Sequence, residues 1–232
     1  MNIIITGASK GIGKAIALKF ASCGYNLFLC SRNLEQLNET AAEIQQEYPA
    51  VKIKLRAADL SEKEQVDSFA DWCLHYGTPE ILINNAGTYL PGNTTDEPEG
   101  SLESMMNINL YSAYHLTRKL VPAMIKNGKG HIFNMCSVAS LQAYHGGGGY
   151  SISKFALHGF TQNLRHELKG HGIKVTAVFP GAVLTDSWGN FDNSQGRIME
   201  ASDIAAMVLA CCKLSPQAVV EDITIRPQLG DL

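Results

Sequence analysis

The sequence lacks any apolar run that could cross a membrane. Runs such as residues 205–212 are much shorter than the roughly 20 residues that a spanning helix needs. The N-terminus also lacks the charged segment and cleavage site of a secretory signal. We therefore expect a soluble, cytoplasmic protein with no membrane partner.

Concentrated charge of one sign is absent as well. The formal net charge is −3, and the charged residues are dispersed along the 232 residues. No basic stripe alternates with aromatic residues, as it does in many nucleic-acid-binding surfaces. We therefore do not expect nucleic acid as a partner.

Cysteine and histidine form no pattern typical of a disulfide framework or a metal site. The six cysteines include no C-x-x-C pair, so we interpret them as reduced and mostly buried. The seven histidines include no His-x-x-x-His pair, and we predict no metal. His145 either faces a substrate or lies in solvent, because it belongs to the loop just before Tyr150.

The sequence does contain enough apolar residues to form one hydrophobic core. Hydrophobic residues make up 45% of the chain, and we predict a single domain spanning residues 1–232. Internal repeats are absent, and the only biased segment is the glycine run Gly146–Gly149. This run is predicted to form a flexible or tightly turned lip of a site.

Strand-like and helix-like segments alternate along the whole chain. Short β-branched or apolar runs occupy residues 2–6, 26–30, 51–55, 81–83, 131–135 and 174–179. Apolar residues at helical spacing mark several of the segments between them, and the longest predicted helices span residues 102–127 and 150–170. This alternation predicts an α/β fold, with a doubly wound parallel sheet covered by helices on both faces. Ligands of such folds bind beyond the carboxyl ends of the strands.

The first predicted strand runs directly into a glycine-rich turn. Gly7, Gly11 and Gly13 permit positive φ angles and close backbone approach, and a helix begins after them. The free N–H groups of that helix end would suit a pyrophosphate. The spacing G-x-x-x-G-x-G differs from the commoner G-x-G-x-x-G, so the segment is either a dinucleotide loop or simply a turn.

The second predicted strand ends in Cys30-Ser31-Arg32 and has no carboxylate there. An acidic residue at this point would favour NAD, whereas a guanidinium can pair with the 2′-phosphate of NADP. Lys10, inside the glycine turn, would add a second cation. These residues predict NADP(H) rather than NAD(H), and the alternative for each cation is an ordinary solvated side chain.

Polar residues follow the later strands at the same edge. Asp59 either lies beside an adenine or belongs to the N-cap region of the next helix, and both roles are compatible. Asn84–Gly87 combines amide and small residues that suit a backbone crossing close to a ligand. Ser137 and Pro180 follow two further strands, so the fold predicts one crevice lined by all of these positions.

Tyr150 and Lys154 lie one helical turn apart, so their side chains share one face of the predicted helix. A nearby ammonium stabilises a phenolate, which lets a tyrosine exchange protons with an alcohol or carbonyl oxygen near neutral pH. Ser137 could hydrogen-bond the same oxygen. By themselves the pair and the serine are also compatible with an ordinary helix and loop. Asn109 is either hydrogen-bonded locally or marks a loosened helix turn that holds a water.

Taken together, these segments resemble the short-chain dehydrogenase/reductase family, in its NADP-preferring form. The matching motifs, in chain order, are TGASKGIG (Thr6 to Gly13), DL (Asp59, Leu60), NNAG (Asn84 to Gly87), NINL around Asn109, Ser137, YSISK (Tyr150 to Lys154) and PGAVLT (Pro180 to Thr185). The resemblance covers nearly the whole chain. It implies a Rossmann-type sheet of about seven strands and an α/β/α arrangement.

The resemblance also implies roles for individual residues. Tyr150 would be the general acid/base, Lys154 would assist it and bind the nicotinamide ribose, Ser137 would orient the carbonyl, and Asn109 would anchor a relay water. The implied cofactor site comprises Gly7, Ser9, Lys10, Gly11, Ile12, Gly13, Ser31, Arg32, Asp59, Leu60, Asn85, Ala86, Gly87, Tyr150, Lys154, Pro180, Gly181, Val183 and Thr185. Val183 and Thr185 would contact the carboxamide.

The implied reaction is hydride transfer between NADP(H) and a small carbonyl or secondary alcohol. One alternative is a 3-oxoacyl-carrier-protein reductase, which would need a basic patch such as Lys126, Lys129, Arg165 and Lys169. Another is a cofactor-sensing protein without catalysis, which predicts a damaged active site. Residues 186–196 are shorter than the lid of many relatives, and a homodimer or homotetramer is expected through the helices at 102–127 and 150–170.

Overall fold

The computed structural model describes residues 1–231, so Leu232, the last residue of the predicted domain, lies outside the described residues. Its strands form one parallel sheet of seven strands in the order β3-β2-β1-β4-β5-β6-β7. The strands are β1 Asn2–Thr6, β2 Asn26–Ser31, β3 Ile53–Ala57, β4 Ile81–Asn84, β5 Gly130–Met135, β6 Ile173–Pro180 and β7 Asp222–Ile225. The predicted doubly wound Rossmann-type fold is confirmed.

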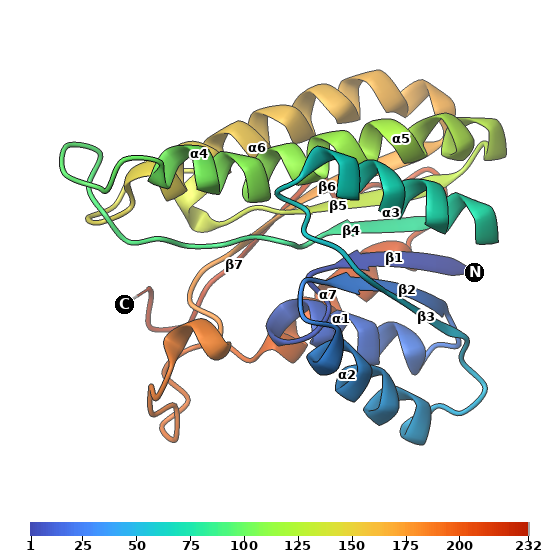
Figure 1. The fold of residues 1–232 in the computed structure, drawn as a ribbon, viewed down its shortest axis with the longest axis horizontal. Coiled ribbons are helices and arrows are strands. Elements are labelled where there is room, and N and C mark those ends of the chain that lie inside the picture. The colour runs from blue at the N-terminus through green and yellow to red at the C-terminus, as the bar shows by residue number, and fades with distance from the viewer. Residues whose placement is uncertain (232) are drawn as a thin grey trace.

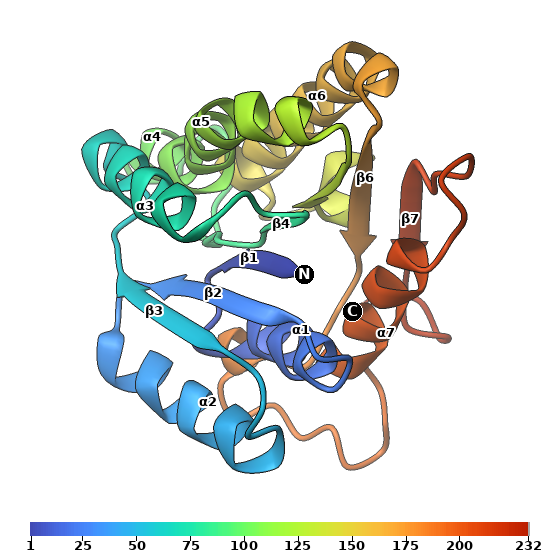
Figure 2. The ribbon, with the colours of Figure 1, turned by 90° about the vertical axis from the view of Figure 1, so that its right-hand side faces the viewer.

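Helices cover both faces of this sheet (Figure 1). The helices α1 Gly11–Ala21, α2 Leu34–Glu47 and α7 Ala201–Cys212 lie on one face, and α3 Lys63–Tyr76, α4 Ser101–Met106, α5 Ser112–Asn127 and α6 Gly148–Leu168 lie on the other. Figure 2, turned by 90°, shows the same three layers. None of the helices in residues 1–231 is both long and apolar enough to cross a membrane.

The sheet order reverses between β1 and β4. Ile3 of β1 lies beside Leu27 of β2 on one side and beside Ile81 of β4 on the other. The chain therefore leaves β1 and β4 toward opposite faces, which opens a crevice at their carboxyl ends. The loops that follow β4 and β6 gather at this edge, near the C-terminal arm (Figure 1).

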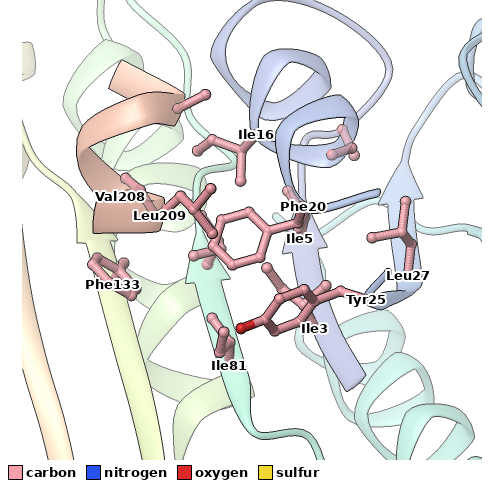
Figure 3. Close-up of a cluster of buried hydrophobic side chains, with 14 of the residues drawn as sticks. Ile3, Ile5, Ile16, Phe20, Tyr25, Leu27, Ile81, Phe133, Val208 and Leu209 are labelled. Atoms are coloured by element: carbon pink, nitrogen blue, oxygen red, sulfur yellow. The ribbon is translucent and has the colours of Figure 1, made fainter. Parts of the chain in front are cut away.

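One core fills the space between the sheet and the helices α1 and α7. Phe20 is fully buried against Ile5 and Leu209, and Figure 3 shows these side chains pointing toward one another. Tyr25 packs edge-on against Phe20, with ring centroids 5.0 Å apart. Burying a side chain of this size contributes roughly 1.5–3 kcal/mol, so this layer anchors the glycine turn that precedes α1.

The helices differ from the sequence-based predictions at three places. The predicted helical segment 102–127 is divided by a π-helical turn at Asn107–Tyr111, between α4 and α5, and this turn contains Asn109, the residue at which a loosened turn was one of the alternatives. Helix α7 was not predicted at all, because its sequence is apolar almost all round and gives little helical periodicity. The helix that carries Tyr150 begins slightly earlier than predicted, at Gly148.

Candidate active site

A cleft of about 1100 Å³ opens at the carboxyl edge of the sheet. Nearly all of the positions predicted from the sequence line it: Gly7, Ser9, Lys10, Gly11, Ile12, Ser31, Arg32, Leu60, Asn85, Ala86, Gly87, Ser137, Tyr150, Lys154, Pro180, Gly181, Val183 and Thr185. His145 lines it too. Gly13, Asp59 and Asn109 lie outside this lining and act on it through neighbours.

The glycine turn leaves the cleft floor open. Gly7 and Gly11 have φ angles of 64° and 55°, in the region where a side chain is strained. Gly13 lies so close to the backbone of Gly7 that a side chain would not fit, because a Cβ on residue 13 would lie 2.3 Å from the carbonyl oxygen of Gly7. Helix α1 has no side-chain N-cap, so its first N–H groups face the cleft side of the turn without a capping side chain.

Asn85 holds this turn from the neighbouring strand β4. Its Nδ2 donates to the carbonyl oxygens of Thr6 and Gly7, at 2.9 and 3.1 Å. The Oγ1 of Thr6 in turn accepts from the backbone N–H groups of Asn85 and Ala86, both at 2.9 Å. Asn85 therefore lines the cleft while its amide fixes the shape of the glycine turn.

The two cations at the cleft, Arg32 and Lys10, differ in their surroundings. Arg32 is exposed and lines both the cleft and a smaller adjoining recess of about 260 Å³, which it shares with Asp59. Lys10 does not stand free beside Arg32, because its Nζ lies 3.2 Å from the carboxylate of Asp186. Both partners of that pair are more than half exposed, so it contributes little and Lys10 can turn away from it.

Asp59 serves the loop that leads into α3. Its Oδ1 accepts from the N–H and the hydroxyl of Ser61, at 3.0 and 2.7 Å. Partial burial opposes ionisation, but these bonds and the nearby charge of Arg32 outweigh it and hold the pKa of Asp59 below its ordinary value. Asp59 therefore fixes the turn just before α3, whose N-cap residue is Glu62, and it lies next to Arg32 in the smaller recess.

Ser137, Tyr150 and Lys154 converge from two elements. Ser137 is 9% exposed and caps the short 3₁₀ turn Val138–Ser140, where its Oγ accepts from the N–H of Ala139 at 3.1 Å. That bond leaves the hydroxyl proton available to another acceptor. Buried Lys154 donates to the carbonyl oxygen of Met135 at 2.8 Å, and its Nζ lies 5.7 Å from the ring centroid of Tyr150.

Asn109 lies within the π-helical turn and is 1% exposed. Its Oδ1 accepts from the N–H of Thr88 at 2.7 Å, and its Nδ2 donates to the carbonyl of Thr88 and to Ser153 Oγ, at 3.0 and 2.9 Å. Both polar atoms of the Asn109 side chain are therefore hydrogen-bonded to other groups of the protein. The side chain joins the loop that follows β4 to the helix that carries Lys154.

Sequence reasoning missed the aromatic part of the cleft. Tyr89, Tyr144 and Trp188 line it, together with Gln142 and Asp231. The ring of Tyr89 lies edge-on to Tyr150 at 5.0 Å. Burial, and then the phenols of Tyr89 and Tyr150, raise the pKa of Tyr144, which therefore stays neutral. These residues come from four segments far apart in the sequence, so no local pattern groups them.

The parallel sheet, the glycine turn and the Ser137-Tyr150-Lys154 cleft define a Rossmann-type oxidoreductase. The sequence matches the family described as short chain dehydrogenase over residues 1–196. The chain therefore belongs to the short-chain dehydrogenase/reductase family, as its motifs predicted.

Individual relatives extend this comparison. Sepiapterin reductase of Chlorobaculum tepidum is 34% identical over 239 residues, covering 99% of this chain and 97% of the relative. A metagenomic short-chain oxidoreductase solved in complex with NADP is 30% identical, with a TM-score of 0.86 and coverage of 98% and 97%. An alcohol dehydrogenase of the archaeon Thermococcus sibiricus, complexed with 5-hydroxy-NADP, is 26% identical, with a TM-score of 0.91 and coverage of 100% and 98%.

Proposed function

We propose that this protein is an NADP(H)-dependent oxidoreductase that interconverts a carbonyl and a secondary alcohol. The observation that carries the proposal is the presence of Ser137, Tyr150 and Lys154 in the same cleft as the open glycine turn. Arg32 directly follows β2, where the sequence has no acidic residue, and its guanidinium suits the 2′-phosphate of NADP. The NADP-bound structural relatives support the same cofactor.

The residues of the cleft fit this cofactor. Gly7, Gly11 and the start of α1 would hold its pyrophosphate, and Lys154 its nicotinamide ribose. When bound, the nicotinamide supplies or accepts the hydride at the carbonyl carbon. Val183 and Thr185, which follow β6 and line the cleft, would contact its carboxamide.

The protein's own residues handle the proton and the orientation. The Ser137 hydroxyl would donate a hydrogen bond to the substrate oxygen, and Tyr150 would give its phenolic proton to that oxygen during reduction. Lys154, held by the Met135 carbonyl, stabilises the phenolate that remains. Asn109 would support the proton relay indirectly, by fixing Thr88 and the helix of Lys154.

The two alternatives have less support. Lys126 and Lys129 lie near the amino end of β5, at the edge of the sheet opposite the cleft. Lys169 follows the end of α6. A helix rises about 1.5 Å per residue, so Lys169 is roughly 28 Å from Tyr150 along the helix axis. Arg165 is engaged with Asp222 at 2.7 Å. The patch invoked for an acyl carrier protein is therefore not at the site. A cofactor sensor without catalysis is disfavoured by the intact residue set.

A carbonyl and alcohol panel followed by NADPH absorbance tests the proposal. The name of the Chlorobaculum relative makes sepiapterin one carbonyl to include. We expect turnover with NADPH and its loss in Tyr150→Phe, which keeps the ring but has no proton to give, by about 100-fold or more. NADPH binding by fluorescence should stay near the wild-type value. Near-full activity of Tyr150→Phe would remove this residue from the mechanism.

We also propose a homo-oligomer built through α5 and α6 of a single catalytic domain. Ile152 and Phe155 are 41% and 46% exposed on α6, and Tyr111 is 45% exposed just before α5. Three large apolar side chains on neighbouring helices are typical of an interface. We further propose a cytoplasmic location, which suits the free cysteines.

A further inference from the structure

The helix that carries Tyr150 begins with an unusually weak first turn. Its N-cap is Gly147, which has no side chain to accept from the free N–H groups, and Gly148 and Gly149 follow. Glycine costs about 1 kcal/mol relative to alanine in a helix. A tyrosine directly after three glycines would not keep a defined place without help from elsewhere.

That help comes from the loop between β4 and α4. The carboxylate of Glu97 accepts from the N–H of Gly149 at 3.0 Å, and so caps α6 from 52 residues away. A negative charge at this helix end also interacts favourably with the helix dipole, by roughly 0.3–2 kcal/mol. The absence of side chains is what permits the approach: a Cβ on Gly148 would lie 2.8 Å from Glu97 Oε2.

Further bonds join the same two loops, residues 92–97 and 146–149, which we call the loop clasp. The N–H of Gly92 donates to the carbonyl of Gly146 at 3.1 Å, and Gly92 pairs with Gly147 as an isolated parallel bridge. The N–H of Gly146 donates to Asn93 Oδ1 at 3.2 Å. The glycine run is therefore a tight turn, packed against its neighbour.

The loop that carries residues 92–97 also contacts the side chain of Tyr150. Tyr89, three residues before Gly92 on the same loop, places its ring edge-on to Tyr150 at 5.0 Å. One loop thus contacts both the backbone of the first α6 turn and the phenol ring. A displacement of about 1 Å at a reacting group can reduce turnover by about 100-fold, so this contact is important for catalysis.

We propose that Glu97 is a positioning residue for Tyr150, which acts by capping the first turn of α6 through the Gly149 N–H. The role rests on the proposed function, in which Tyr150 exchanges the proton. Glu97 itself is not among the residues that line the cleft.

The test compares Glu97→Ala, Glu97→Gln and the matched control Glu99→Ala, an exposed glutamate on the same loop. In Glu97→Ala we expect kcat to fall by about 10- to 100-fold, because the first turn loses its acceptor. The KM and Kd for NADPH should change by less than about twofold, since the glycine turn and Arg32 are untouched. Glu97→Gln keeps an acceptor oxygen and should recover kcat to within about threefold of wild type.

Hydrogen exchange supplies a readout that does not need activity. Amides of residues 146–154 should exchange faster in Glu97→Ala, and at the wild-type rate in Glu97→Gln and Glu99→Ala. Asn93→Ala removes the Gly146 bond and should raise exchange at 146–149 with a smaller fall in kcat, which keeps the test open if Glu97→Ala does not fold.

Unchanged kcat and unchanged exchange in Glu97→Ala would overturn the proposal. A fall in NADPH affinity as large as the fall in kcat would also overturn it, because that result indicates a general loss of the fold. If the wild type reduces no carbonyl in the panel, the proposed function fails, while exchange at 146–154 still decides whether Glu97 holds this turn.

Discussion

Asn85 and Asn109 are polar residues near the cleft whose side chains support the surrounding structure. Each occurs in a motif near the cleft, and each side-chain amide is bonded to protein atoms: Asn85 to the glycine turn, Asn109 to Thr88 and Ser153. Buried amides are costly without such partners. These bonds fix the glycine turn and the first part of the loop after β4, both of which border the cleft.

Arg32 is the residue to which we attribute the proposed cofactor preference. Arg32→Ala should raise the KM for NADPH by about tenfold and leave that for NADH nearly unchanged, because only NADPH carries the 2′-phosphate that a guanidinium pairs with. Lys10→Ala should have a smaller effect, because the ammonium of this half-exposed side chain lacks the bidentate geometry of a guanidinium. Initial rates with both cofactors measure the ratio, and an unchanged ratio in Arg32→Ala would refute the assignment.

At the scale of elements, strands and helices meet through buried polar groups under the cleft. Asn84 of β4 donates to Thr117 of α5 at 3.0 Å and to Asn134 of β5 at 2.8 Å. Asn134 donates in turn to Thr161 of α6 at 2.8 Å. This chain of bonds ties α5 and α6 to the central strands. It holds the catalytic helix in register with the sheet that carries the glycine turn.

His131 joins β5 to β6 in a similar way. Its Nε2 is 2.8 Å from Thr176 Oγ1, its ring stacks on Phe133 at 3.9 Å, and Cys212 Sγ lies 4.0 Å from Nδ1. Burial, and to a lesser degree the charge of Lys174, lower the pKa of His131 to about 3. The folded protein therefore keeps this histidine neutral at pH values where the unfolded chain protonates it.

The pH dependence of stability follows from this shift. Below the unfolded pKa of about 6.5 the unfolded state binds more protons, so stability is fully present above that pH and is lost as the pH falls toward 3. His131→Gln should remove up to about 1.4 kcal/mol per pH unit of this slope. Urea denaturation between pH 7.5 and 4.5 would measure it, with exposed His166→Gln as control. Parallel slopes for wild type and His131→Gln would contradict the assignment.

At the scale of the whole molecule, the sheet order decides which loops share the cleft. Because all strands are parallel, every carboxyl end lies at one edge, and the loops after β1, β2, β4, β5 and β6 all line the cleft there. The same arrangement leaves the outer faces of α5 and α6 uncovered by the chain's own helices (Figure 1). These faces are where the proposed oligomer would form.

The oligomer proposal predicts the effect of one charge. Phe155→Glu should convert an assembly of at least two 25.2 kDa chains into a monomer, because it would bury an unpaired carboxylate at the interface. Light scattering after size exclusion gives the mass directly. Met207→Glu, at a site 41% exposed on α7, is the matched control and should leave the mass unchanged. A monomeric wild type would exclude the interface.

The sequence by itself determined most of the order of strands and helices, the fold class, the family and most residues at the strand ends. Those features depend on local periodicity, and on parallel strands that end at one edge. It did not predict α7, whose apolar sequence gives little helical periodicity, and it left open whether Asn109 marks a loosened turn, which the structure shows as the π-helical turn Asn107–Tyr111.

Only the tertiary structure decided which distant residues share the site. It brought Tyr89, Tyr144 and Asp231 into the cleft and Glu97 onto the first turn of α6. It also put Lys169 at the far end of the catalytic helix. Loop paths between elements are set by contacts among residues far apart in sequence, and no local pattern records them.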